Sequence, residues 1–127
     1  MLTVLPYCMA QTTSFKGVFW NKKENIFLHI DLYKESITIP TLEFLDKTNG
    51  YMDGNIYGIW MVTSSQIKGN TATVKLANDF GSEVQIIELT KENDSTLVYK
   101  AKEPAVIKRA IKRKLVKIPT SLQFIRK

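Results

Sequence analysis

Residues able to do acid–base chemistry are few in this sequence, and the first pair is His29 and Asp31. His29 is the only histidine in the 127-residue chain. Asp31 follows it by two residues in a segment that alternates apolar and polar side chains, so both would lie on one face of a β-strand. An aspartate placed there can orient a histidine as a general base. Because no nucleophile signature and no second histidine accompany the pair, we interpret His29 as a histidine at the surface or rim of a sheet.

Five carboxylates gather in one half of the sequence and could form a hydrolytic pair: Asp31, Glu35, Glu43, Asp46 and Asp53. An ordinary acidic surface has the same composition. A hydrolase that uses Asp31 or Glu43 is therefore the third of three hypotheses, and we expect no enzymatic activity. One histidine offers too little for zinc, which takes three or four ligands from His, Cys or carboxylate. We expect neither a metal nor a cofactor.

A basic segment near the C-terminus has the spacing of an amphipathic helix. Residues 106–118, VIKRAIKRKLVKI, hold six cationic side chains and no acid. Ile107, Ile111 and Leu115 recur every four residues, and Pro104 stands where the first turn of a helix would be. This spacing predicts one amphipathic helix near residues 104–116, before a last strand. Four cations form its outward basic face: Lys108, Arg109, Lys112 and Arg113.

The basic face favours an acidic partner over a nucleic acid. Residues 100–127 contain ten Lys or Arg side chains and a single acid, Glu103. Between Lys100 and Leu122 there is no aromatic residue on which a base could stack. The face therefore suggests an interaction or inhibitor-type protein that binds an acidic partner, which is our alternative function. The same cations could instead pair with carboxylates of this chain, or face only water.

Most of the remaining chain has the pattern of short β-strands separated by turns. In residues 26–33, Ile26, Leu28 and Ile30 share one face, which is typical of a strand buried on one side. Turn-forming residues recur about every ten positions between Asn49 and Ser95. The sequence predicts a mainly-β fold, an antiparallel meander of about eight strands that closes as a small β-barrel or packs as a sandwich.

Aromatic residues are spread over nearly every expected strand, and most of them belong to a core. A small closed barrel either fills its interior with side chains or keeps room for one ligand. Four aromatic residues are the candidates to line such a cavity: Phe27, Tyr33, Tyr57 and Trp60. Our leading hypothesis is a non-catalytic binding module for a small apolar ligand or a protein partner.

The two ends of the expected barrel carry a motif known from a family of small barrels. Residues 14–20, SFKGVFW, precede the first long strand, and Arg126 lies in the last one. This arrangement resembles the calycin pattern of lipocalins and fatty-acid-binding proteins, in which a Gly-x-Trp on the first strand packs near an arginine from the last. In this chain two residues separate Gly17 from Trp20. The resemblance implies an up-and-down barrel closed around an apolar ligand, with Trp20 and Arg126 in structural roles.

Residues 1–10 have features of the end of a secretory signal. The first fifteen residues carry no charge, and Cys8 and Ala10 put small side chains three and one positions before a cut ahead of Gln11. Residues 11–127 would then be a single β-rich domain, exported to the periplasm or the extracellular space. That domain would contain no cysteine, which excludes disulfides, thiol catalysis and Cys-ligated zinc. No stretch approaches the ~18 consecutive apolar residues of a membrane span, so we do not expect an integral membrane protein.

Overall fold

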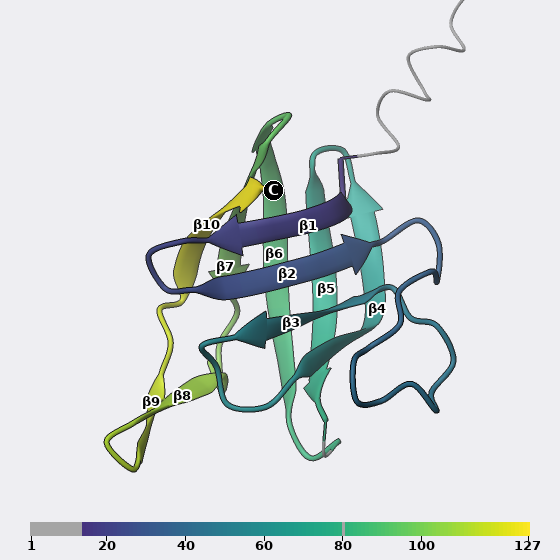
Figure 1. Ribbon diagram of the computed structural model, residues 1–127. Helices are drawn as coiled ribbons and strands as arrows, with labels where there is room; N and C mark the ends of the chain where they lie inside the picture. Colours follow the sequence, from purple (N-terminus) through teal and green to yellow (C-terminus); the bar gives the residue numbers. More distant parts are fainter. Residues whose placement is uncertain (1–13, 80) are drawn as a thin grey trace, which may run out of the picture.

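Residues 14–79 and 81–127, the part of the chain that the computed structural model describes, form ten β-strands and no helix (Figure 1). The strands are β1 (Lys16–Asn21), β2 (Ile26–Asp31), β3 (Gly50–Gly54), β4 (Trp60–Lys68), β5 (Thr71–Asn78), β6 (Val84–Asn93), β7 (Thr96–Ala101), β8 (Lys108–Ile111), β9 (Lys114–Lys117) and β10 (Ser121–Arg126).

Eight of these strands close into one barrel in the order β1-β10-β7-β6-β5-β4-β3-β2, and every neighbouring pair that is registered is antiparallel. Each barrel strand therefore lies beside its neighbour along the chain, apart from the β8–β9 insertion between β7 and β10. The predicted mainly-β antiparallel fold is confirmed. Of the two architectures that the sequence left open, the structure has the barrel.

The centre of the barrel is occupied by apolar side chains that alternate along the strands. In β2, Ile26, Leu28 and Ile30 point inward and are almost completely buried. They join one continuous cluster to which all eight barrel strands contribute, including Phe19 of β1 and Phe124 of β10. Burying one such side chain stabilises a fold by about 1.5–3 kcal/mol. The alternating pattern thus accounts for both the strands and the core.

The prediction of an amphipathic helix near residues 104–116 is wrong, because this segment forms a hairpin. Strand β8 pairs with β9, and Lys112 and Arg113 make the turn between them. The three apolar residues expected on one helix face are separated: Ile107 is buried, whereas Ile111 and Leu115 are exposed.

The helical spacing does not determine the structure of this segment, for two physical reasons. Residues four apart also share a face along a single strand, so this spacing alone does not specify a helix, and in the hairpin the turn puts Ile111 and Leu115 on opposite faces. A helix would in addition place like charges at i and i+4, which is unfavourable. The hairpin is held at its base, where the amide of Ile118 donates to the carbonyl of Ile107 over 3.1 Å and both side chains are buried.

The predicted signal remnant, residues 1–10, lies outside the described residues. In residues 14–79 and 81–127 no helix is long and apolar enough to cross a membrane.

Candidate functional site

The structure separates the four aromatic residues that we expected to line a cavity. Phe27 lies on the outer face of β2, stacked between Trp20 at 5.8 Å and His29 at 6.3 Å between ring centroids. Tyr33 is exposed just after β2, where its hydroxyl accepts a hydrogen bond from the backbone amide of Phe15. Only Tyr57 and Trp60 come together.

Tyr57 and Trp60 line a hollow at the end of the barrel next to the β8–β9 hairpin, which we call the hairpin hollow. Its volume is about 220 Å³, and its walls are Tyr57, Trp60, Asn78, Asp79, Ser82, Glu83, Val106, Lys108 and Leu115. The amide of Tyr57 donates to the carbonyl of Lys108 over 2.7 Å, so the hairpin is tied to the connection before β4. Indole, phenol, aliphatic and charged groups therefore face one small space.

Two polar atoms that belong to residues lining the hairpin hollow are buried and have no hydrogen-bond partner within residues 14–79 and 81–127. They are Nε1 of Trp60, a residue that is only 2% exposed, and Oδ1 of Asp79. The neighbouring Asn78 differs, since its Oδ1 accepts from the amides of Ser82 and Glu83 and its Nδ2 donates to the hydroxyl of Ser82. Buried donors and acceptors normally find partners. A donor and an acceptor without one mark this hollow as a candidate binding site.

The four cations of the predicted basic face do not share one face in the hairpin. Lys108 is half-buried in the wall of the hairpin hollow. Arg109 forms an ion pair with Glu24, at 2.9 Å between Nη2 and Oε1, and both side chains are mostly buried. Lys112 and Arg113 form the tip and are exposed. Glu24 lies in the turn between β1 and β2, so an intramolecular carboxylate does accept one of the four.

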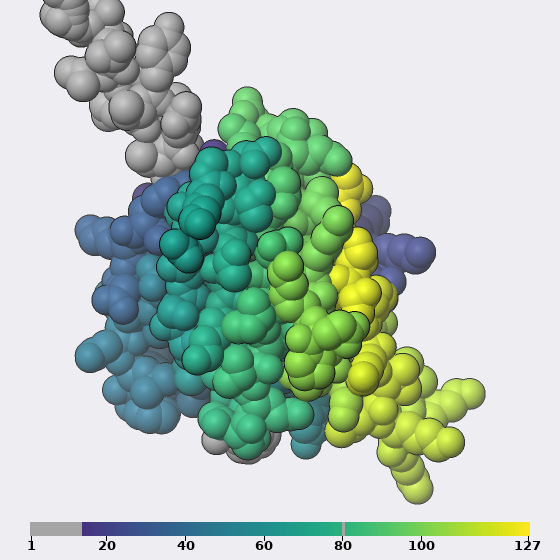
Figure 2. All heavy atoms as spheres, turned by 180° about the vertical axis from the view of Figure 1, so that it is seen from behind, coloured from purple at the N-terminus to yellow at the C-terminus, as the bar shows by residue number. Residues whose placement is uncertain are grey.

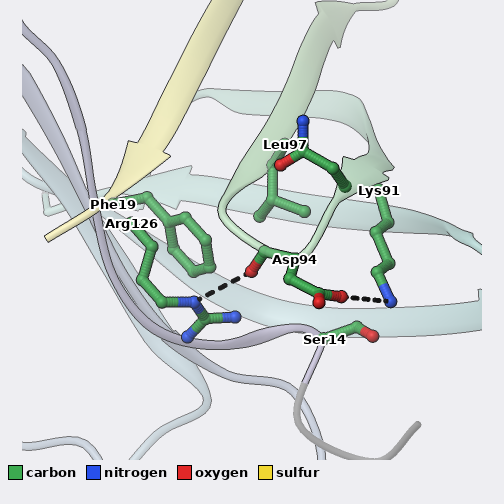
Figure 3. Close-up of a pocket in the computed structure, with 7 residues that line it drawn as sticks. Ser14, Phe19, Lys91, Asp94, Leu97 and Arg126 are labelled. Atoms are coloured by element: carbon green, nitrogen blue, oxygen red, sulfur yellow. Dashed lines mark hydrogen bonds and ion pairs between the residues drawn. The ribbon is translucent and has the colours of Figure 1, made fainter.

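A second hollow, of about 400 Å³, lies around Arg126, and its polar groups bond to one another (Figure 3). The Nε of Arg126 donates to the carbonyl of Asp94, its Nη1 donates to the carbonyl of Lys16, and Lys91 pairs with the Asp94 carboxylate at 3.3 Å. The guanidinium also lies 4.7 Å above the ring centre of Phe19. These contacts join β1, β10 and the β6–β7 turn, which is a structural role.

A further hollow, of about 320 Å³, lies on the outer face beside His29 and Asp31. His29 contacts Asp53 and not Asp31, with 3.2 Å between Nε2 and Oδ1. The buried Asp31 carboxylate accepts from the amides of Tyr33 and Lys34 and from the Ser36 hydroxyl, so it holds the turn after β2. Strand register, which the sequence alone did not reveal, determines that His29 meets Asp53.

Tyr51 completes the outer face near His29. The two rings stack with their centroids 4.3 Å apart, and burial together with the nearby Asp53 charge raises the pKa of the Tyr51 hydroxyl.

Glu43, the other carboxylate of the hydrolase hypothesis, is exposed in the connection between β2 and β3. Within residues 14–79 and 81–127, no three His, Cys, Asp or Glu side chains gather as metal ligands.

Tyr99 gives a test of the packed interior. Its hydroxyl is buried and has no hydrogen-bond partner in the described part of the chain, and burial raises its pKa well above the usual value of about 10. Removing a buried unpaired hydroxyl avoids its desolvation cost, so Tyr99→Phe is expected to raise the free energy of unfolding by about 1 kcal/mol. Urea denaturation at neutral pH measures this, and a loss of stability would contradict it.

The same residue predicts a pH dependence. Above pH 10 the unfolded chain loses the Tyr99 proton while the folded protein keeps it, so the unfolded state binds fewer protons. The contribution of Tyr99 is therefore constant below about pH 10 and falls by about 1.4 kcal/mol per pH unit above it, up to the folded pKa. The stability difference between Tyr99→Phe and the wild type should widen over that range, and a difference that stays constant would exclude the effect.

No protein-family model, no curated protein and no solved structure matches this chain.

Proposed function

We propose that this chain is a non-catalytic binding module whose small ligand occupies the hairpin hollow. The observation that carries the proposal is the Trp60 indole N–H, which is almost completely buried and has no acceptor among the described residues. A bound molecule with an acceptor atom would remove the cost of that unpaired donor. Asp79 also lines the hollow and its Oδ1 has no donor among the described residues, so on this proposal it accepts a hydrogen bond from the same ligand.

The size and walls of the hollow define the ligand class. A volume of about 220 Å³ corresponds to roughly seven water molecules at about 30 Å³ each. Tyr57, Val106 and Leu115 offer apolar surface to the body of the ligand. A hydroxyl group can both accept from Trp60 and donate to Asp79. The ligand is therefore a small, mostly apolar molecule with one hydroxyl or carboxamide group.

Two further features bear on the barrel type and on the location of the module. Gly17 and Phe19 pack with Arg126, since a β-carbon on Gly17 would lie 2.6 Å from Arg126 Nη1 and the guanidinium covers the Phe19 ring. The calycin resemblance names Trp20 as the partner of Arg126, whereas here the guanidinium covers Phe19 and the Trp20 ring stacks on Phe27. The uncharged N-terminus with Cys8 and Ala10 before Gln11 supports export, so we propose a periplasmic or extracellular module.

Nuclear magnetic resonance tests the ligand site directly, because the chain has two tryptophans and therefore two indole N–H signals. Trp20→Phe and Trp60→Phe assign them. On titration with phenol or cyclohexanol, the Trp60 signal is expected to shift and saturate while the Trp20 signal stays in place. Native mass spectrometry of the purified chain is expected to show a small molecule that co-purifies.

The matched variants are Asp79→Ala in the hollow and Asp94→Ala at the other end of the barrel. A hydrogen bond to a charged group contributes about 1.5–3 kcal/mol, so Asp79→Ala should weaken phenol binding by about tenfold or more. Asp94→Ala should leave it unchanged. If neither indole signal moves, or if both move together, the hairpin hollow is not the ligand site.

A further inference from the structure

The β8–β9 hairpin, residues 108–117, projects from the end of the barrel and is visible as a separate arm from both sides of the molecule (Figures 1 and 2). We call it the basic hairpin. Its two strands pair only with each other, and it meets the barrel at its base through the Arg109–Glu24 ion pair and the Tyr57–Lys108 hydrogen bond. Its outer half is surrounded by solvent.

The charge of the basic hairpin is not balanced. Its ten residues hold six cations and no acid. Arg109 is neutralised by Glu24, but in residues 14–79 and 81–127 no carboxylate pairs with the other five: Lys108, Lys112, Arg113, Lys114 and Lys117. Lys108 and Lys117 even stand directly opposite each other, which is an unfavourable cross-strand pair.

The turn is also built against local preference. Lys112 and Arg113 have φ angles of 48° and 71°, the left-handed region that a two-residue type I′ turn requires. Asn-Gly is the sequence that suits this turn, and long side chains are strained in it. The hairpin thus accepts backbone strain and like-charge repulsion to hold two cations at its tip. Neither feature contributes to the stability of the barrel.

Apolar side chains follow the tip on both faces of the hairpin. The register puts Ile111 and Val116 on one face, 46% and 43% exposed, and Leu115 on the other, 52% exposed. A flat partner surface could cover only one of these faces. A cleft would cover both at once, with its floor against the cationic tip.

We propose that the basic hairpin inserts tip first into an acidic cleft of a partner protein. Lys112 and Arg113 meet carboxylates at the floor of the cleft, Ile111 and Val116 contact one apolar wall, and Leu115, which also borders the hairpin hollow, contacts the other wall with its exposed part. A membrane would require the opposite order, since insertion would carry the two tip cations deepest into the apolar layer. A nucleic acid would match the charge but would leave the three apolar side chains without a contact.

Two variants and a control separate charge from folding. Lys112→Glu/Arg113→Glu reverses the charge of the tip. Lys112→Asn/Arg113→Gly removes the tip charge and installs the preferred turn, so the hairpin becomes more stable while binding is lost. Lys22→Glu/Lys23→Glu, in the exposed β1–β2 turn next to Glu24, makes the same change of charge near the base of the hairpin and not at its tip.

A sulfonated calixarene, a cup with an anionic rim and apolar walls, serves as a first probe of the full chain. Adding the calixarene is expected to shift the nuclear magnetic resonance signals of residues 111–116. Its affinity should fall at least tenfold in both tip variants and less than twofold in the control. Added salt should weaken the binding progressively. Equal shifts at Lys22 and Lys23 would overturn the proposal. So would tip-dependent binding to phosphatidylglycerol–phosphatidylcholine vesicles or to duplex DNA that exceeds the binding to the calixarene.

A photoreactive amino acid at position 113 then tests the partner class in an extract of cells that express the chain. The expected product is an adduct with Asp- or Glu-rich peptides of one protein, which forms in the Lys22→Glu/Lys23→Glu background. Reversing the neighbouring Lys112 should reduce that adduct at least tenfold. Adducts with lipid or nucleic acid, or the absence of a protein adduct that depends on Lys112, would overturn the proposal.

Discussion

Replacing Gly50 by alanine is expected to lower the free energy of unfolding by about 3–5 kcal/mol, which combines the usual costs of overpacking and backbone strain. Gly50 begins β3 with φ of 143° and is buried against β2. A β-carbon there would lie 2.1 Å from the carbonyl oxygen of His29 and 2.8 Å from Cα of Ile30. These are backbone atoms, so no side-chain rotation can relieve the clash. The two strands would have to separate.

Gly69→Ala is the matched control, because Gly69 also has a positive φ, 61°, but no atom lies within 4 Å of the position of its β-carbon. Only the left-handed conformation is then penalised, at about 1–2 kcal/mol. Urea denaturation of both variants measures the difference. Equal losses would show that β2 and β3 are not packed as closely as the Gly50 contacts require.

The barrel could be predicted from the sequence because its core residues occupy every second position along the strands. In β2 the inward positions are Ile26, Leu28 and Ile30, and the turn residues between later strands mark where the chain reverses. Alternation does not distinguish a barrel from a sandwich, because each strand has one buried face in both. Closure depends on the β1–β10 pairing, between strands about a hundred residues apart.

The hairpin could not be recognised because its local signals are ambiguous. Apolar residues at 107, 111 and 115 fit a helix and equally a strand. Gly, Asn or Asp would have marked the turn, but Lys112 and Arg113 occupy it. A residue pattern indicates only the conformations that its residues favour locally. The turn at Lys112 and Arg113 has a backbone conformation that these residues disfavour, so the pattern could not indicate it.

Part of the site could be predicted from the sequence. Phe27 shares a strand face with His29, opposite the inward Ile26 and Leu28, and this alternation already favours an outward position for Phe27. The hairpin hollow could not be predicted, because it brings Trp60 together with Asp79 and with residues of the hairpin, a segment that the sequence predicted to be a helix. The Arg109–Glu24 pair links residues far apart in the chain, which no local spacing indicates.

Replacing Arg126 by methionine is expected to lower the free energy of unfolding by about 2–4 kcal/mol. The side chain bridges the carbonyls of Asp94 and Lys16 and covers the ring of Phe19, so the variant loses charge-assisted hydrogen bonds and a cation–π contact together. The effect should concentrate where β1 meets β10, since only Phe19 and Trp20 of β1 have registered partners there.

Arg126→Lys separates the two parts of that loss. A lysine keeps a cation near Phe19 but cannot bond two carbonyls through a planar guanidinium, so it should recover less than half of the stability. In hydrogen exchange of Arg126→Met, the Lys127 amide, which donates to Val18 across this junction, should lose protection before the amides between β5 and β6. The hairpin hollow does not include Arg126, so phenol should still shift the Trp60 indole signal in the folded variant. Uniform loss of protection around the barrel would mean that Arg126 stabilises the fold as a whole and does not act as the local closure of β1 onto β10.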